Sequence, residues 1–193
     1  MALFRNPYLA FEDEKLMQLV GEKDQKAFGV LYDRYGKLLY NYFHKMLWKD
    51  KEKSRDFTQD LFAKLVHKPH LYDPSRPFKT WLYSIAHNMC KNEYAKAEVR
   101  RNAQPELAYV PNTEFRNEAQ SSMDRAEFNI KLAEALDELD ETKRTTFELR
   151  FRHEMSIEEI GETMQCSEGT VKSRLFYTLK QLNQKLKVFE GIA

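Results

Sequence analysis

The sequence has 193 residues, 42% apolar and 32% charged with a net charge of +1, so it can bury a core in one or two domains and is not uniformly basic. Six Gly, six Pro and two distant cysteines, Cys90 and Cys166, argue against collagen-like, disulfide-framework and zinc-ribbon proteins. The N-terminus lacks a signal-peptide pattern and no apolar run reaches about 18 residues, so we expect a soluble, cytoplasmic protein with no membrane insertion.

The first hundred residues are dominated by apolar side chains at helical spacing. Helices are predicted around residues 16–21, over 25–48, around 57–66 and from 78 to about 101. The aromatic residues of 25–48 are expected to lie in the core. The segment 67–77, HKPHLYDPSRP, has three prolines in eleven residues and is predicted to be a loop.

The next twenty residues, 102–121, lose this periodicity. They contain two prolines and lean acidic, which is typical of a linker. The charges also change along the chain: residues 1–100 carry a net +5, residues 101–168 a net −8 and residues 169–193 a net +4. Two basic ends around an acidic middle suggest two surfaces that face nucleic acid.

Helical periodicity returns at Met123 and continues through four predicted helices. No segment alternates with period two for long enough to predict a strand. We therefore predict an all-α chain of two helical domains, residues 1–101 and 122–193, joined by a flexible linker over 102–121. The C-terminal domain is predicted to contain a helix-turn-helix.

The first helix of this motif has a clear start. Ser156 and Glu159 have the spacing of a capping box, in which each side chain accepts a hydrogen bond from the backbone N–H of the other residue. Residues 157–164 then place their apolar side chains on one face. Gly161 is expected to lie where the two helices cross and a small residue is needed.

The turn and the second helix follow directly. Gln165 and Cys166 are expected to form the turn, and Ser167 to cap a helix that begins at Glu168. Its predicted buried stripe is Val171, Leu175, Leu179, Leu182 and Leu186. The opposite face presents polar and cationic groups suited to reading the major groove, at Glu168, Gly169, Thr170, Lys172, Ser173, Arg174 and Tyr177. A helical hairpin with a solvated basic face is the alternative.

These residues carry a resemblance to a known family. The run LAEALDELDETKRTTFELRFRHEMSIEEIGETMQCSEGTVKSRL, residues 132–175, resembles region 4 of bacterial sigma factors of the extracytoplasmic-function (ECF) class. The segments AFGVLYDRYGKLLYNYF, DFTQDLFAKL and FKTWLYSIAHNMCKNEY resemble region 2 of that class. The resemblance covers roughly residues 12–100 and 124–187, in the order of the family.

The resemblance implies a function without an enzymatic activity or a cofactor. A sigma factor binds core RNA polymerase and directs promoter recognition, DNA melting and transcription initiation. Its expected partners are core RNA polymerase, promoter DNA and an anti-sigma factor that covers the same surfaces. The linker would thread the polymerase.

The resemblance also implies roles for individual residues. Core polymerase would bind the polar face of Asp56, Gln59 and Asp60, whose carboxylates and amide suit arginine recognition. The −35 promoter element would bind the polar face of the second helix of the helix-turn-helix. The −10 element would be bound and melted by aromatic, amide and cationic side chains that can stack on unpaired bases, namely Tyr72, Lys79, Thr80, Trp81, Tyr83, Asn88, Lys91 and Asn92. Trp81 is equally compatible with a core position.

The chain departs from the family at four positions. Gln165 stands in the turn where the family usually has Gly, and a non-Gly residue in the left-handed conformation costs about 1 kcal/mol or slightly more. Ser84, His87 and Tyr177 stand where Arg is common. We therefore expect a strained turn and fewer phosphate contacts.

Two other functions remain open on the residues alone. An autonomous helix-turn-helix regulator would bind its operator tightly without polymerase and would present a dimerisation surface. A metal-dependent nuclease would use the carboxylates of Asp56 and Asp60, but no basic phosphate clamp accompanies them. His67 and His70 have metal-like spacing with Pro69 between them, and we expect surface histidines and no metal site.

Overall fold

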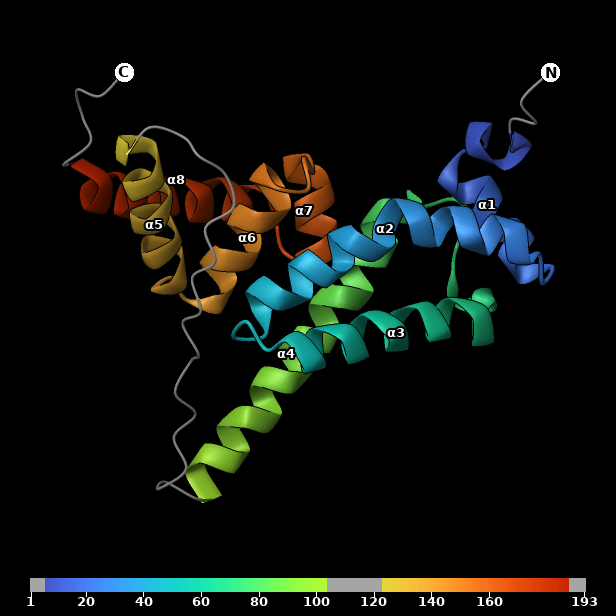
Figure 1. The fold of residues 1–193 in the computed structure, drawn as a ribbon, viewed down its shortest axis with the longest axis horizontal. Helices are drawn as coiled ribbons and strands as arrows, with labels where there is room; N and C mark the ends of the chain where they lie inside the picture. The colour runs from blue at the N-terminus through green and yellow to red at the C-terminus, as the bar shows by residue number, and fades with distance from the viewer. Residues whose placement is uncertain (1–5, 104–122, 188–193) are drawn as a thin grey trace. The chain divides into compact units, whose positions relative to one another are not determined.

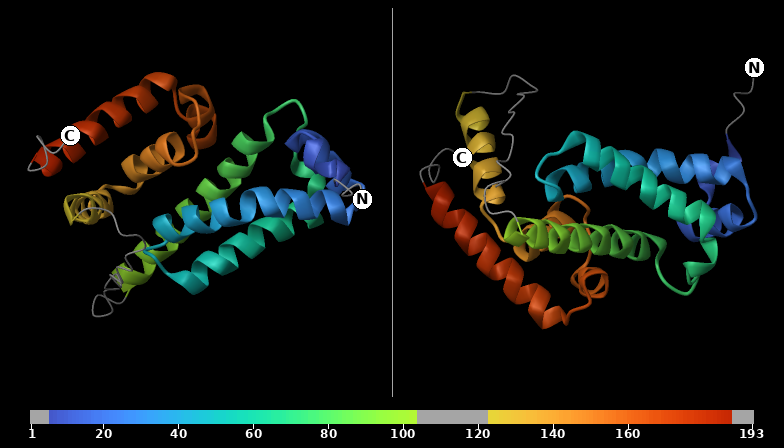
Figure 2. Two further views of the ribbon diagram at one scale, coloured as in Figure 1. Left: turned by 45° about the horizontal axis from the view of Figure 1, so that its top comes forward. Right: turned by 90° about the horizontal axis from the view of Figure 1, so that it is seen from below.

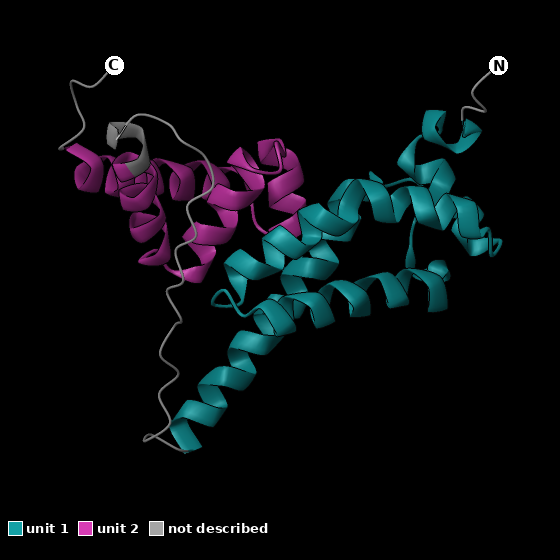
Figure 3. Ribbon diagram, viewed as in Figure 1, with its two compact units in different colours: residues 1–112 teal, residues 113–193 magenta. Residues whose placement is uncertain are grey.

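The structure is a computed structural model that describes residues 6–103 and 123–187. In these two ranges the chain folds into eight α-helices and two short 3-10 helices, without a strand (Figure 1). It divides into two compact units, residues 1–112 and 113–193 (Figure 3). The predicted all-α fold with two helical domains is confirmed. The predicted linker lies almost entirely outside the described residues.

Unit 1 contains four of the α-helices and both 3-10 helices. In chain order they are η1 (Pro7–Ala10), α1 (Asp13–Gly21), α2 (Gln25–Met46), α3 (Lys51–His67), η2 (Pro69–Leu71) and α4 (Phe78–Ala103). Helices α2 and α3 lie side by side, and α1 and α4 pack against them (Figures 1 and 2). α3 begins earlier than its apolar pattern predicts, because Asp50 caps a polar first turn by accepting a hydrogen bond from the Lys53 N–H at 3.0 Å.

The core of unit 1 is rich in aromatic rings. Tyr42 and Phe43 of α2 are fully buried, as predicted for the aromatic residues of this helix, and Tyr35 is nearly so. Tyr42 meets Tyr83 of α4 edge to face at 5.7 Å between ring centroids. Burial of each large apolar side chain contributes about 1.5–3 kcal/mol, so these rings hold α4 firmly on α2. The prediction does not hold for all aromatic residues of 25–48, because Tyr32 is exposed and three others are only half-buried, namely Phe28, Tyr40 and Trp48.

Unit 2 is built on its last helix. Its helices are α5 (Met123–Asp137), α6 (Glu141–Phe151), α7 (Ile157–Met164) and α8 (Glu168–Leu186). The first three all pack against α8 (Figure 2). Its core includes Ala135, Leu136, Leu139, Phe147 and Leu182, with Leu132 at the edge. None of the described helices of either unit is both long and apolar enough to cross a membrane.

The buried stripe of α8 differs from the predicted one at two positions, since Leu186 is only half-buried and Leu179 is exposed. Leu179 is 45% exposed, whereas Thr178 is fully buried. At 3.6 residues per turn, Thr178 lies nearer than Leu179 to the centre of the line through Val171, Leu175 and Leu182. The angular position of a residue around the helix axis, and not the polarity of its side chain, thus determines which residue is buried here. The buried Oγ1 of Thr178 finds no hydrogen-bond partner among the described residues.

Candidate nucleic-acid and protein interfaces

The start of α7 is fixed by the predicted capping box. Ser156 Oγ accepts a hydrogen bond from the Glu159 N–H at 3.1 Å, and Glu159 Oε2 accepts one from the Ser156 N–H at 2.6 Å. α8 begins in a similar way, because Ser167 Oγ accepts a hydrogen bond from the Thr170 N–H at 3.2 Å. Two capped starts therefore define both helices of the motif independently of tertiary contacts.

The turn between α7 and α8 is tight. Gln165 adopts the left-handed conformation, with φ 53° and ψ 48°, in the place where glycine avoids the cost. The Cys166 N–H donates to the Gly161 carbonyl at 2.9 Å. A Cβ on Gly161 would lie 2.9 Å from the Cys166 carbonyl oxygen. Glycine is therefore needed here first because the turn backbone folds back onto α7, and only secondarily because α8 passes nearby.

The polar face of α8 is presented to solvent largely as predicted. Five of its members are exposed, Glu168, Gly169, Lys172, Ser173 and Tyr177, while Thr170 and Arg174 are half-buried. Phe176 is also exposed beside Tyr177, with ring centroids 5.4 Å apart, and the sequence pattern did not mark it. The face thus combines hydroxyl, cationic and aromatic groups on the first turns of one helix, and these groups suit binding in a DNA groove.

Two cations on this face are held differently. Lys172 Nζ forms an exposed ion pair with Glu168 Oε2 at 2.9 Å. Arg174 Nη1 instead contacts the thiol sulfur of Cys166 in the turn at 3.4 Å. The half-buried Arg174 is therefore oriented by the turn, whereas Lys172 must leave its carboxylate before it can bind a phosphate. The sequence alone did not predict this contact, because Cys166 and Arg174 come together only when the turn between α7 and α8 is formed.

The polar face of α3 is exposed over its whole length. Asp56, Gln59 and Asp60 are exposed, and Leu61 and Leu65 on the opposite side are fully buried. Towards the C-terminal end of α3 two large apolar side chains are exposed, Val66 on α3 and Tyr32 on α2. The sequence pattern did not predict that Val66 is exposed, because Val66 fits the apolar periodicity of the helix.

A metal site at Asp56 and Asp60 would need a further protein ligand, and the described residues do not provide one. No group of three or more His, Cys, Asp or Glu side chains within residues 6–103 and 123–187 is arranged to hold a metal ion. His67 and His70 are both exposed. The carboxylates of Asp56 and Asp60 therefore stand as a surface pair, spaced one turn apart on a polar helix face.

Three of the eight residues predicted to contact the −10 element are buried in unit 1. Tyr83 is 0%, Thr80 3% and Tyr72 7% exposed, so their side chains pack in the core of unit 1. Burial raises the pKa of the Tyr83 hydroxyl. The sequence pattern does not reveal this burial, because α4 packs against α1, α2 and α3 and is buried on more than one face.

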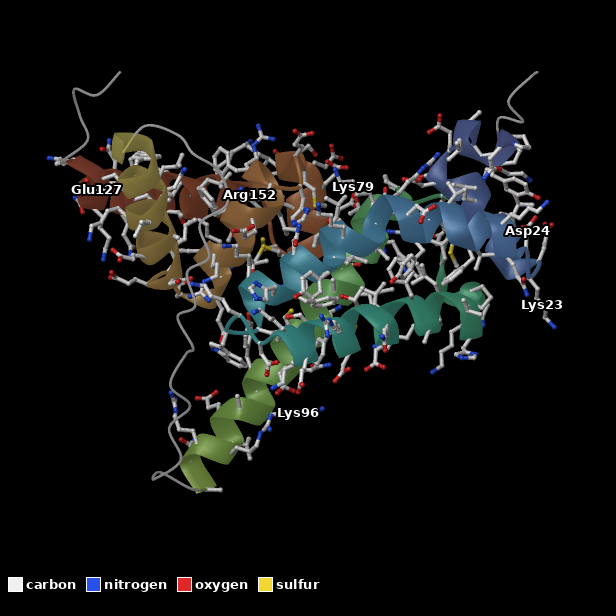
Figure 4. All side chains as sticks on the ribbon, viewed as in Figure 1. Lys23, Asp24, Lys79, Lys96, Glu127 and Arg152 are labelled. Atoms are coloured by element: carbon white, nitrogen blue, oxygen red, sulfur yellow. The ribbon has the colours of Figure 1, made fainter. Side chains whose placement is uncertain are left out.

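The other five residues of that set reach the surface of α4. Asn88, Lys91 and Asn92 are exposed, and Lys79 and Trp81 are half-buried. The Trp81 ring packs on Tyr72 at 4.9 Å between centroids, so it is partly a core residue and partly accessible. Figure 4 shows Lys79 near the start of α4 and Lys96 towards its other end. Cationic groups thus lie near the start of α4 and again from Lys91 onwards.

A groove of about 690 Å³ lies between α3 and the C-terminal half of α4. In it, Glu93 Oε1 accepts hydrogen bonds from Lys53 Nζ at 2.9 Å and from Arg100 Nη2 at 2.7 Å. Burial opposes ionisation of the Glu93 carboxyl, but these two cations outweigh it and hold its pKa below the ordinary value of 4.5. The side chain of Glu93 is only 9% exposed, so this network ties α3 to α4.

Substituting Glu93 should therefore destabilise unit 1 in a pH-dependent way. A carboxyl with a lowered folded pKa contributes stability above its unfolded pKa and loses it as the pH falls through the folded value. We expect Glu93→Gln to cost about 1–2 kcal/mol at pH 7, since it removes charge-assisted hydrogen bonds, and to cost progressively less below about pH 4.5.

Both tryptophans, Trp48 and Trp81, belong to unit 1, so tryptophan fluorescence in urea titrations reports its unfolding. Glu98→Gln, at an exposed position on the same helix, is the matched control and should have little effect. If the loss in free energy of unfolding caused by Glu93→Gln stays constant from pH 7 to pH 3.5, the ionised Glu93 carboxylate does not stabilise unit 1.

Comparison with known proteins gives a consistent result for both units. The family description "Sigma-70 region 2" matches residues 31–100, and "Sigma-70, region 4" matches residues 135–184. The chain is 28% identical over 183 residues to the ECF RNA polymerase sigma-E factor of Haemophilus influenzae, which covers 91% of this chain and 95% of that protein. It is 27% identical over 184 residues to the RNA polymerase sigma-H factor of Pseudomonas aeruginosa, covering 91% and 94%.

Solved structures show the same fold. CnrH in complex with the cytosolic domain of CnrY is similar with a TM-score of 0.67 and 24% identity, over 91% of this chain and 97% of that one. The sigma factor RpoE of Bartonella quintana, in complex with the anti-sigma factor NepR, gives a TM-score of 0.72 at 21% identity, over 84% and 98%. The helical arrangement of both units therefore has precedents among solved chains.

Proposed function

This chain belongs to the sigma-70 family as a sigma factor of the ECF class, and we propose that its two units divide promoter recognition between them. Unit 1 binds core RNA polymerase and the −10 element, and unit 2 binds the −35 element. The observation that carries the proposal is that the two matched segments, 31–100 and 135–184, fall one in each compact unit. Residues 102–121 act as the linker between the two functions.

Core polymerase docks on the polar face of α3. Asp56, Gln59 and Asp60 offer two carboxylates and an exposed amide, whose oxygens can accept hydrogen bonds from arginine. Their exposure and the buried leucines behind them support this role, since docking there requires no rearrangement of the helix. The exposed side chains of Tyr32 and Val66 extend the docking surface.

The −10 element binds along α4 and the loop that precedes it. Lys79, Trp81, Asn88, Lys91 and Asn92 remain accessible to DNA. The half-exposed Trp81 ring offers a stacking surface to an unpaired base, and the cations and amides bind the strand. Tyr72, Thr80 and Tyr83 support this surface from within the unit and do not contact DNA.

The −35 element binds the exposed face of α8, residues Glu168, Gly169, Thr170, Lys172, Ser173, Arg174 and Tyr177. The start of α8 is capped and its opposite face is buried, so these side chains enter a major groove on a rigid support. Affinity then depends on the polymerase, because the near-neutral chain neutralises few phosphates by itself.

The other expected features follow from the family. The protein acts in the cytoplasm as a binding subunit, without an enzymatic activity or a cofactor. The similarity to RpoE bound to NepR supports an anti-sigma partner for this chain as well, covering the polymerase-facing and DNA-facing surfaces.

Run-off transcription tests this function directly. The purified chain is added to core RNA polymerase on a library of genomic fragments, and we expect transcripts from a defined set of promoters that core polymerase alone does not produce. Tight operator binding by the free chain as a dimer would instead indicate an autonomous regulator. Mg²⁺-dependent cleavage that is lost when Asp56 and Asp60 are changed would indicate a nuclease.

A further inference from the structure

Helix α4 begins after a residue whose side chain cannot cap it. The residue before Phe78 is Pro77, whose ring has no hydrogen-bond acceptor, so the N–H groups of the first turn need acceptors from elsewhere. Glu14, in the first turn of α1, provides one: its Oε1 accepts a hydrogen bond from the Phe78 N–H at 2.8 Å. A carboxylate is well suited to this place, because the N-terminus of a helix carries partial positive charge.

The residue next to Glu14 fixes α1 on α2. The carboxylate of Asp13 accepts hydrogen bonds from Arg34 Nη1 at 2.5 Å and from the Tyr35 hydroxyl. Arg34 also donates from Nη2 to the Leu9 carbonyl at 2.9 Å. Asp13 and Glu14 together therefore connect the start of α4 to the packed pair of α1 and α2. The connection joins positions 64 residues apart in the chain.

Glu14 also lies close to the other end of the loop that precedes α4. Burial raises the pKa of Tyr72 to about 12, and the nearby charge of Glu14 adds to this effect. The Tyr72 hydroxyl donates to the Arg76 carbonyl at 2.8 Å, and its ring meets that of Phe78 at 5.7 Å. Glu14 thus binds the end of the loop 73–77 at Phe78, and Tyr72 connects the other end to Arg76 and Phe78.

We propose that Glu14 is a positioning residue for promoter opening, holding the loop 73–77 and the start of α4 in the orientation that receives the unpaired DNA strand. The proposal rests on the proposed function of α4 and extends it to the first helix. Glu14 lies outside residues 31–100, the segment matched by region 2. Its role follows from the contact with Phe78 and not from that match.

The test compares holoenzymes assembled from core RNA polymerase and the full chain. The variants are Glu14→Ala, which removes the acceptor, Glu14→Asp, which keeps the charge but shortens the reach, and Glu14→Gln, which keeps an acceptor oxygen. Glu12→Ala is the matched control, because Glu12 is exposed and makes no side-chain cap hydrogen bond. The probe is a duplex promoter that the wild-type holoenzyme transcribes, and open complexes are measured by permanganate reactivity of unpaired thymines.

We expect Glu14→Ala to reduce open-complex formation about tenfold, consistent with the loss of one charge-assisted hydrogen bond, and Glu14→Asp to share the defect. Glu14→Gln should stay within about threefold of wild type, and affinity for core polymerase should be unchanged in all variants. Equal opening by Glu14→Ala and Glu12→Ala would overturn the inference, as would a parallel loss of polymerase affinity, which indicates general destabilisation of unit 1. If no promoter can be found that core polymerase transcribes only with the wild-type chain, the proposed function itself is overturned.

Discussion

A chain carrying both Asp56→Arg and Asp60→Arg should lose affinity for core RNA polymerase by about 100-fold or more. Each carboxylate can accept charge-assisted hydrogen bonds worth about 1.5–3 kcal/mol, and arginine at the same place replaces attraction with repulsion. The helix itself should be little affected. Both positions are exposed, and Leu61 and Leu65 on the opposite face keep their burial.

The matched control changes the net charge equally at a distance from α3. Glu22→Arg with Glu98→Arg replaces two exposed carboxylates, one after α1 and one on α4. Polymerase affinity is measured by co-purification and by competition with a labelled wild-type chain, and folding by helicity and melting temperature. Undiminished binding of the double Asp variant, or an equal loss in the control, would show that α3 does not provide the docking face.

Local patterns predicted the fold well where one face of a helix decides its packing. The capping box of Ser156 and Glu159 and the cap at Ser167 depend on residues three positions apart, so the sequence contains all the information they need. The polar face of α3 was predicted for the same reason, since its exposed and buried residues alternate at the period of a helix.

Local patterns failed where several elements meet. Tyr83 and Thr80 were predicted to lie on a DNA-facing surface, but both are buried because the first turns of α4 pack against other helices on more than one side. The hydrogen bond from Phe78 to Glu14 joins positions that no short-range spacing relates. In α8, Thr178 is buried in place of Leu179 because its angular position on the helix, and not its polarity, determines its surroundings.

Arg174→Ala should weaken occupancy of the −35 element by the holoenzyme more than any other single truncation on α8. Arg174 is half-buried and contacts Cys166 Sγ at 3.4 Å, so less conformational entropy is lost when its planar guanidinium binds a guanine or a phosphate. If Arg174 reads a base, its truncation should cost about 1–3 kcal/mol of binding free energy, or roughly 5- to 150-fold in affinity, and relax the preference at one base pair. A phosphate-binding arginine should weaken all promoters alike and reduce the salt slope by about one.

Lys172→Ala should also weaken occupancy of the −35 element, but by a smaller factor than Arg174→Ala. Its ammonium lacks the bidentate geometry of arginine and must first leave the ion pair with Glu168. Lys185→Ala serves as the control, because Lys185 lies about three turns beyond Arg174 and pairs with Glu138. Promoter occupancy is measured at two salt concentrations together with polymerase affinity, which should stay constant because docking lies mainly on unit 1. Normal occupancy by both Arg174→Ala and Lys172→Ala would mean that α8 does not read the promoter, and the exposed polar face would then be only a solvated surface.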